Sequence, residues 1–218
     1  MHDMKYYFKE QMEMIVSSAE LHAKWLNSLS LMENTGARKI SRYEDPVHTN
    51  IIVLKHAAEE ARHAYYLKKQ IDKLNIQCPD YSFKYLLAPM QSYQYLRKLD
   101  AAACKYLKEK LNMEGRAMHN GAYLLVTYAI EVRADELYGV YQDVLTAQKS
   151  KVNVKSIIVE EEGHLAEMTK MLESFHPEWQ KLATDIRQVE STLFKEWLTA
   201  IKREVASLAI AKITDAYC

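Results

Sequence analysis

Two Glu-x-x-His motifs are the residues of this chain best suited to chemistry: Glu60–His63 and Glu161–His164. Side chains three residues apart on a helix project from neighbouring turns of one face, so a carboxylate and an imidazole can converge on one ion. Each motif interrupts an apolar stripe of helical spacing, and the stripe around the second motif runs from 154 to 175. The pattern predicts two helices that carry metal ligands on their apolar faces.

A single Glu-x-x-His motif is weak evidence for a metal site. With 8 histidines and 20 glutamates in 218 residues, chance alone gives about 0.7 such pairs. The chain holds three, and the third, Glu173–His176, directly precedes Pro177 at an expected helix end. A histidine there is suited to capping carbonyls and to complementing the helix dipole, so we assign that motif no metal.

The two remaining motifs each follow a long helical segment with a candidate carboxylate. Glu20 shares a helical face with Val16 and Ala23, and Glu131 shares one with Leu124. One Glu from each of two helices, with one Glu-x-x-His from each of two others, is the ligand inventory of four-helix bundles that hold two iron or manganese ions. The sequence therefore contains four candidate carboxylates and two candidate histidines.

This inventory resembles the ferritin-like diiron-carboxylate superfamily, which includes rubrerythrins, bacterioferritins, ribonucleotide reductase small subunits and bacterial multicomponent monooxygenases. The resemblance covers about residues 8–175. It implies a four-helix bundle with two iron ions, manganese being the alternative, and the following metal ligands: Glu20, Glu60, His63, Glu131, Glu161 and His164.

The spacing of the carboxylates fits the resemblance in one half of the chain better than in the other. In such families the first Glu precedes its Glu-x-x-His motif by a little over thirty residues. Glu131 precedes Glu161 by 30 residues, whereas Glu20 precedes Glu60 by 40, an excess that the connection 36–46 would absorb. Glu136 and Glu13 are the alternatives to Glu131 and Glu20.

The physical argument for metal is the cost of the alternative. Several carboxylates turned into one apolar bundle are strongly destabilising unless cations or protons neutralise them. Oxygen ligands with two imidazoles suit iron or manganese. The cysteines, Cys78, Cys104 and Cys218, are scattered without paired spacing, which argues against a thiolate zinc site, an iron–sulfur cluster or a disulfide framework.

Several polar residues near the proposed ligands are candidates for supporting roles. Glu59, Glu160 and Glu162 fall off the apolar stripes and are expected outside the ligand set or just behind it. Asp135 is a candidate to orient a histidine. Tyr128, on the Glu131 face, is the tyrosine with the strongest claim to a functional role.

The elements that must position these residues are helices. The chain has only 5 glycines and 4 prolines, about 4% where average usage is near 12%. We expect a single all-α domain over 1–218: a ferritin-like four-helix bundle with an extra helix between the two helix pairs and a long C-terminal helix. The expected helical segments are 5–34, 47–74, 91–111, 116–147, 154–175 and 178–211.

These features favour an oxidoreductase that activates O2 or peroxide, with an unspecified small substrate and an electron donor. A non-catalytic iron-binding, storage or ferroxidase bundle is the alternative, and a monooxygenase resembling tRNA hydroxylases is a further one. The net charge of zero makes a nucleic-acid partner unlikely. The absence of a signal sequence or membrane span favours the cytoplasm, and the extra helices could cover a substrate pocket or form a homodimer face.

Overall fold

The computed structural model describes residues 2–44 and 47–216, and the side chains of 6–44 and 47–208. These residues form seven α-helices and a short 3-10 turn, with no strand among them. The elements are α1 (His2–Val16), α2 (Ala19–Tyr43), α3 (Ile51–Asp72), η1 (Phe83–Tyr85), α4 (Pro89–Leu111), α5 (Gly115–Ala147), α6 (Lys155–Phe175) and α7 (Trp179–Ala216). The all-α prediction is confirmed.

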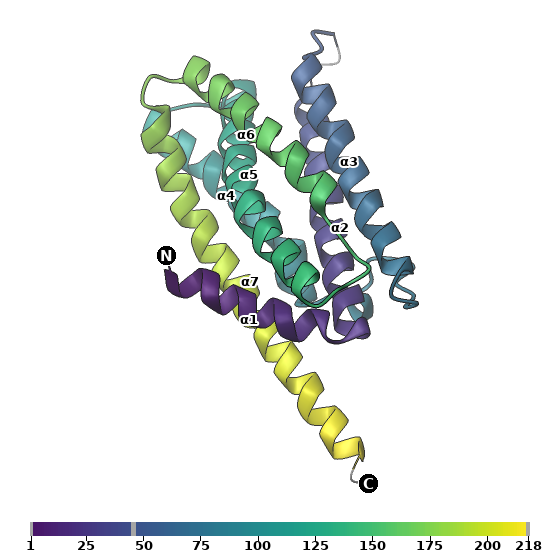
Figure 1. Cartoon of the computed structure of the whole chain (residues 1–218). Coiled ribbons are helices and arrows are strands. Elements are labelled where there is room, and N and C mark those ends of the chain that lie inside the picture. The colour runs from purple at the N-terminus through teal and green to yellow at the C-terminus, as the bar shows by residue number, and fades with distance from the viewer. Residues whose placement is uncertain (1, 45–46, 217–218) are drawn as a thin grey trace.

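The helices associate as two pairs, α2 with α3 and α5 with α6, and the helices α1, α4 and α7 pack against α5 (Figure 1). The most extensive helix contact joins α2 to α3, and the next joins α5 to α6. Helix α4 connects the two pairs and packs on α5 and α7. By contrast, α3 and α6 touch at only a few points, and it is across this gap that the two Glu-x-x-His motifs face each other.

The first expected segment, 5–34, is divided differently in the structure. Helix α1 ends at Val16, and α2 begins again after Ser18, whose hydroxyl accepts a hydrogen bond from the backbone N–H of Leu21. Helix α2 then continues through Gly36 to Tyr43, so the expected break at Gly36 is wrong. A glycine inside a helix costs only about 1 kcal/mol relative to alanine, and the buried side chains of Ala37 and Ile40 hold the following turns in place.

The apolar core lies where α1, α2, α5 and α7 meet, with a second part between α4, α5 and α6. Trp25 of α2 and Trp197 of α7 are fully buried and stack with ring centroids 5.2 Å apart. This contact joins α7 to the first helix pair, while the far end of α7 projects past α1 (Figure 1). The core therefore fixes how far α2, α5 and α7 are shifted along their axes relative to one another.

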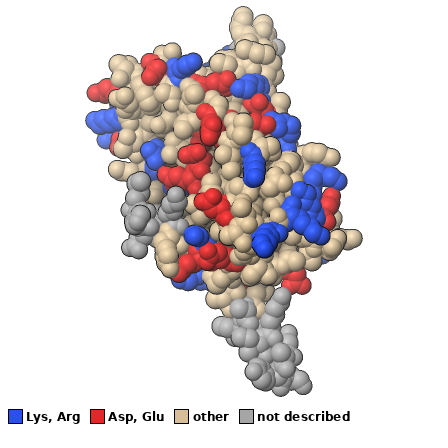
Figure 2. Space-filling model, viewed as in Figure 1, with Lys and Arg blue, Asp and Glu red and all other residues tan. Residues whose placement is uncertain are grey.

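Charges of both signs are interspersed over the face shown in Figure 2. None of the described helices combines the length and the hydropathy that crossing a membrane requires.

A buried ion pair joins α5 to α7. Arg133 donates to both carboxylate oxygens of Glu190, with Nε to Oε1 and Nη2 to Oε2 at 2.8 Å each. Glu190 is only 2% exposed and also accepts a hydrogen bond from Tyr95 of α4. Bidentate geometry and a third donor satisfy this carboxylate in an otherwise apolar region.

Replacing Arg133 with Met should therefore destabilise the protein by about 3–5 kcal/mol, because it leaves an uncompensated buried charge on Glu190. The measurement is the free energy of unfolding in urea. The double variant Arg133→Met/Glu190→Gln removes that charge and should recover more than half of the loss. Equal stability of the single and double variants would contradict this account.

Candidate metal centre

Four helices contribute one buried or half-buried carboxylate each to a single cluster: Glu33 from α2, Glu60 from α3, Glu131 from α5 and Glu161 from α6. The histidines of the two motifs complete it. Two groups have ligand atoms within 4.8 Å of one another: Glu33, Glu60, His63 and Glu161 form one, and Glu60, Glu131, Glu161 and His164 form the other. This buried Glu/His group could hold a metal ion.

The structure brings together five of the six residues predicted as ligands and does not include Glu20. Glu20 lies exposed in the first turn of α2, while Glu33 takes the place expected for it. At 1.5 Å per residue, the 13 residues between them amount to about 20 Å along the helix. The expected helix ended near Asn34, whereas α2 continues to Tyr43 and carries Glu33 in its interior, at the level of the cluster.

The spacing argument itself points to Glu33 once α2 is continued through Gly36. Glu33 precedes Glu60 by 27 residues, close to the 30 that separate Glu131 from Glu161. The alternatives Glu13 and Glu136 are both exposed, and Glu136 forms an ion pair with Arg133. Glu131, rather than Glu136, is the residue of α5 in the cluster.

Each histidine is braced by the glutamate that precedes the motif of the opposite helix. His63 Nε2 on α3 lies 2.7 Å from Glu160 Oε2 on α6, and His164 Nε2 on α6 lies 2.7 Å from Glu59 Oε2 on α3. Because an ionised carboxylate only accepts hydrogen bonds, the neutral form of each imidazole carries its proton on Nε2 and has its lone pair on Nδ1. This is the arrangement in which carboxylates orient metal-binding imidazoles.

The three atoms best placed to bind a cation lack a hydrogen-bond partner within the described part of the chain. They are His63 Nδ1, His164 Nδ1 and Glu131 Oε2, all buried. His63 Nδ1 lies 3.1 Å from one oxygen of Glu161, and His164 Nδ1 lies 3.4 Å from the other. Buried polar atoms are rarely left unsatisfied, so these converging lone pairs fit a bound cation.

Burial and crowding perturb the ionisation of the carboxylates in the cluster. Burial, followed by the charges of Glu33 and Glu161, raises the pKa of Glu60 well above its ordinary value. Burial and the charge of Glu161 do the same to the pKa of Glu131. For Glu161, burial also acts to raise the pKa, but the adjacent carboxyl group of Glu131 and the imidazoles of His164 and His63 outweigh it and lower the pKa. Without a cation, protons must therefore compensate part of the negative charge.

The hydroxyl group nearest the cluster differs from the one expected. Tyr138 is fully buried and donates its hydroxyl proton to Glu33. Tyr128 instead lies partly exposed, edge-on to Trp179 with ring centroids 6.0 Å apart. Asp135 is exposed and does not brace either histidine, a role taken by Glu59 and Glu160.

A third buried histidine extends the row of braced imidazoles. His56 lies one turn before Glu60, and its ring centroid is 4.6 Å from that of His164. His56 Nε2 lies 2.8 Å from Glu167 Oε2, which also accepts a hydrogen bond from Lys55 through Oε1 at 2.7 Å. Together with Arg62 and Glu160, these pairs hold α3 to α6 mainly through charged groups.

Comparison with protein-family models, with curated proteins and with solved structures found no match to this chain.

The raised pKa of Glu131 has a consequence for stability without metal. Above its ordinary pKa of 4.5 the unfolded chain releases this proton while the fold retains it, so the free energy of unfolding falls as the pH rises. Glu131→Gln abolishes that titration, because the amide carries no charge at any of these pH values. At pH 7 with chelator present, we expect this variant to be more stable than the parent by about 1–3 kcal/mol.

That advantage should vanish below about pH 4.5, where Glu131 is protonated in both states. Urea unfolding at pH 4 and pH 7 measures both values. Glu136→Gln, an exposed change on the same helix, is the matched control and should show no such pH dependence. A constant difference between Glu131→Gln and the parent at both pH values would refute the assignment of a buried, protonated Glu131.

The bracing carboxylates yield a separate prediction for metal affinity. Glu160→Gln and Glu59→Gln should each weaken binding of Mn²⁺ by about 10–100-fold, because each replaces the charged acceptor that orients a histidine by a neutral amide oxygen, which is a weaker acceptor. Glu162→Gln, an exposed neighbour in the same run of glutamates, should leave the affinity within about twofold. Isothermal titration of the metal-free protein provides the comparison, and equal affinities for all three variants would show that the braces are irrelevant to binding.

Proposed function

We propose that this protein is a ferritin-like dinuclear metal–carboxylate oxidoreductase that activates O2 or peroxide, with iron as the first choice of metal and manganese as the second. The observation that carries the proposal is the pair of overlapping ligand groups that share Glu60 and Glu161. In this proposal Glu33 and His63 would hold one ion and Glu131 and His164 the other, and Glu60 and Glu161 belong to both groups.

The charge of the donor set supports two divalent ions. Four carboxylates carry four negative charges when ionised, and His63 and His164, whose Nε2 atoms face Glu160 and Glu59, would bind a cation as neutral imidazoles through Nδ1. Two divalent cations balance that charge, whereas one leaves two buried negative charges uncompensated. Oxygen donors with two nitrogen donors match the preferences of iron and manganese.

When bound, such ions supply the redox chemistry with O2 or peroxide, and the protein controls binding and access. The chain's own contribution follows from its contacts. The tyrosine Tyr138 holds one oxygen of Glu33 by donating to it, and the braces prevent rotation of His63 and His164. Burial of Glu131 and Glu161 keeps bulk water away from the donor atoms.

Turnover in this proposal requires an external electron donor and an oxidisable substrate. Anaerobic titration with Fe²⁺, followed by measurement of O2 consumption, tests it directly. Two ions bound per chain and O2 uptake that depends on them are expected. Absence of stoichiometric metal would refute the site, and uptake of many more ions than two per chain would instead indicate storage.

The proposal distinguishes Glu33 from Glu20 on the same helix. Glu33→Ala should reduce the Fe²⁺ stoichiometry from two to one or none, because it removes a ligand that belongs to one of the groups. Glu20→Ala, in the exposed first turn of α2, should retain both ions. Metal analysis after gel filtration gives the result, and loss of iron from Glu20→Ala with retention by Glu33→Ala would reverse the assignment.

A further inference from the structure

The outward face of α3 carries an apolar stripe. Its members recur at alternating intervals of three and four residues: Ile51, Leu54, Ala58, Ala61 and Tyr65. All five are exposed, and the three large side chains, Ile51, Leu54 and Tyr65, are 77%, 38% and 65% exposed. Such intervals keep side chains on one face of a helix, so the stripe is continuous over about four turns.

The stripe serves neither the core nor the candidate metal centre. Glu60 and His63 are buried on the other side of the same helix. Within the described part of the chain, α3 packs on α2 and meets α6 at a few points, and it forms an outer edge of the molecule (Figure 1). Scattered exposed apolar residues need no explanation, but an aligned row of them with polar neighbours marks an interaction surface.

The pattern of large and small side chains is the same in both directions from the middle of the stripe. Leu54 and Tyr65 lie equally far from the point between residues 59 and 60, and Ala58 and Ala61 lie equally far from it inside them. A second copy of α3 running antiparallel would set Leu54 against Tyr65, and Ala58 against Ala61, twice each. A two-fold interface requires a surface that is complementary to itself, and this stripe meets that condition.

The sizes of the side chains suit close packing of two helices. Alanines at the centre allow the helix axes to approach to about 8 Å, while Leu54 and Tyr65 cover both ends of the contact. One layer further out, Ile51 would lie against the aliphatic stem of Lys68. The ammonium group of Lys68 already donates to the carbonyl oxygen of Cys78 at 2.7 Å, so its charge is directed away from that contact.

The charged row beside the stripe favours a second copy over an acidic partner. In the antiparallel register, Lys55 of one copy would lie near Arg62 of the other. Each cation already has an anion on its own α6: Lys55 Nζ lies 2.7 Å from Glu167 Oε1, and Arg62 Nη1 lies 2.8 Å from Glu160 Oε1. Compensated ion pairs repel one another little, and they leave little attraction for a foreign carboxylate.

We propose that the α3 stripe is the dimer face of this protein, and that two copies associate antiparallel about a two-fold axis passing between residues 59 and 60. A contact from residue 51 to residue 68 is about 26 Å long. One helix face is smaller than the roughly 800 Å² per partner of a standard interface, so we expect a reversible dimer with a dissociation constant on the order of 10 μM. The proposal does not depend on the proposed function, because the stripe contains no candidate ligand.

Sedimentation equilibrium of the full-length, metal-free protein from about 1 to 300 μM tests the association. Ala61→Glu sets a charge against Ala58 of the other copy at both ends of the central layer, and it should weaken the dimer at least about tenfold. Ala101→Glu, at an exposed alanine of α4, is the matched control and should dimerise as the parent does. A parent that stays monomeric, or equal dimerisation of the two variants, would overturn the proposal.

Disulfide cross-linking tests the register, in protein that also carries Cys104→Ser and Cys218→Ser. Leu54→Cys and Tyr65→Cys are prepared separately, and the mixed dimer keeps its second Leu54–Tyr65 contact. Positions 54 and 65 of different copies would be opposite each other and within reach of a disulfide, whereas the two copies of position 54 would be about 16 Å apart along the helix axis.

Oxidation of an equimolar mixture of these two variants should therefore give covalent dimers, and oxidation of either variant alone should not. Circular dichroism checks that both variants are folded. Absence of cross-linked dimers in the mixture, or equal cross-linking of either variant alone, would overturn the antiparallel α3 interface. Metal binding is measured separately by Fe²⁺ stoichiometry, so failure of one proposal leaves the other standing.

Discussion

The burial of four carboxylates in the middle of a helical bundle is the constraint on which the rest of this structure depends. Glu131 and Glu161 are 2% and 3% exposed, and each has an oxygen within 4.8 Å of the other. Like charges at that distance repel strongly where little water screens them. Two kinds of group lie against these carboxylates. Tyr138 donates a hydrogen bond to Glu33, and the Nδ1 atoms of two imidazoles face Glu161. His63 Nδ1, His164 Nδ1 and Glu131 Oε2 remain without a hydrogen-bond partner in the described part of the chain. Their convergence is the strongest structural argument for a bound cation.

The duplicated motif also explains how α3 and α6 are held. Each Glu-x-x-His helix supplies a ligand pair to the cluster and, from the preceding glutamate, a brace for the histidine across the gap. The same carboxylates pair with Arg62 and Lys55 toward solvent. Contacts between these two helices are therefore made largely by charged groups, whereas α2 with α3 and α5 with α6 are joined by broad apolar faces.

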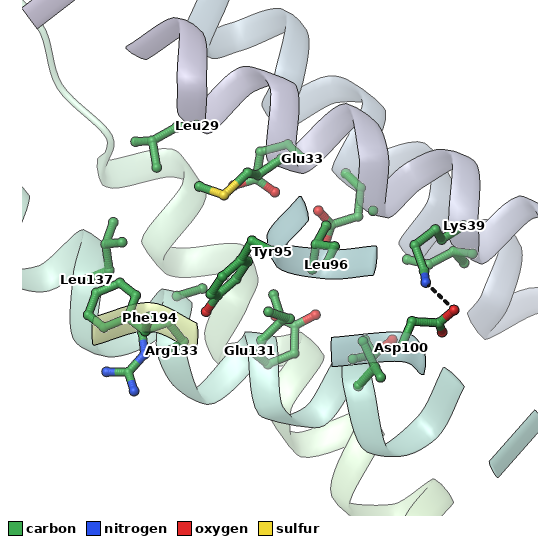
Figure 3. Close-up of a pocket in the computed structure, with 18 of the residues that line it drawn as sticks. Leu29, Glu33, Lys39, Tyr95, Leu96, Asp100, Glu131, Arg133, Leu137 and Phe194 are labelled. Atoms are coloured by element: carbon green, nitrogen blue, oxygen red, sulfur yellow. Dashed lines mark ion pairs between the residues drawn. The ribbon is translucent and has the colours of Figure 1, made fainter. Parts of the chain in front are cut away.

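Two helices outside the helix pairs, α4 and α7, are placed to control access to the cluster and contribute no residue to it. Helices α4 and α7 lie behind α5, on the side of the cluster away from the histidines, and together with α2 they enclose an apolar space that reaches Glu33, Glu60 and Glu131 (Figure 3). Gly36 contributes to that space by the absence of a side chain. The buried Arg133–Glu190 pair and the Trp25–Trp197 stack fix α7 against this space, so its shape depends on residues far from the ligands in sequence.

The sequence by itself determined the fold class and most of the residues of the Glu/His cluster. Few glycines and prolines indicate long helices, and the i, i+3 spacing places Glu60 with His63 and Glu161 with His164 on single faces because helical geometry is local. Only the tertiary structure decided that Glu33, and not Glu20, joins them, because both share one long helix and the choice depends on the axial level at which α2 packs against α3 and α5. The same holds for the braces: Glu59 and Glu160 lie off the apolar stripe of their own helix, and only the approach of the opposite helix brings them to a histidine.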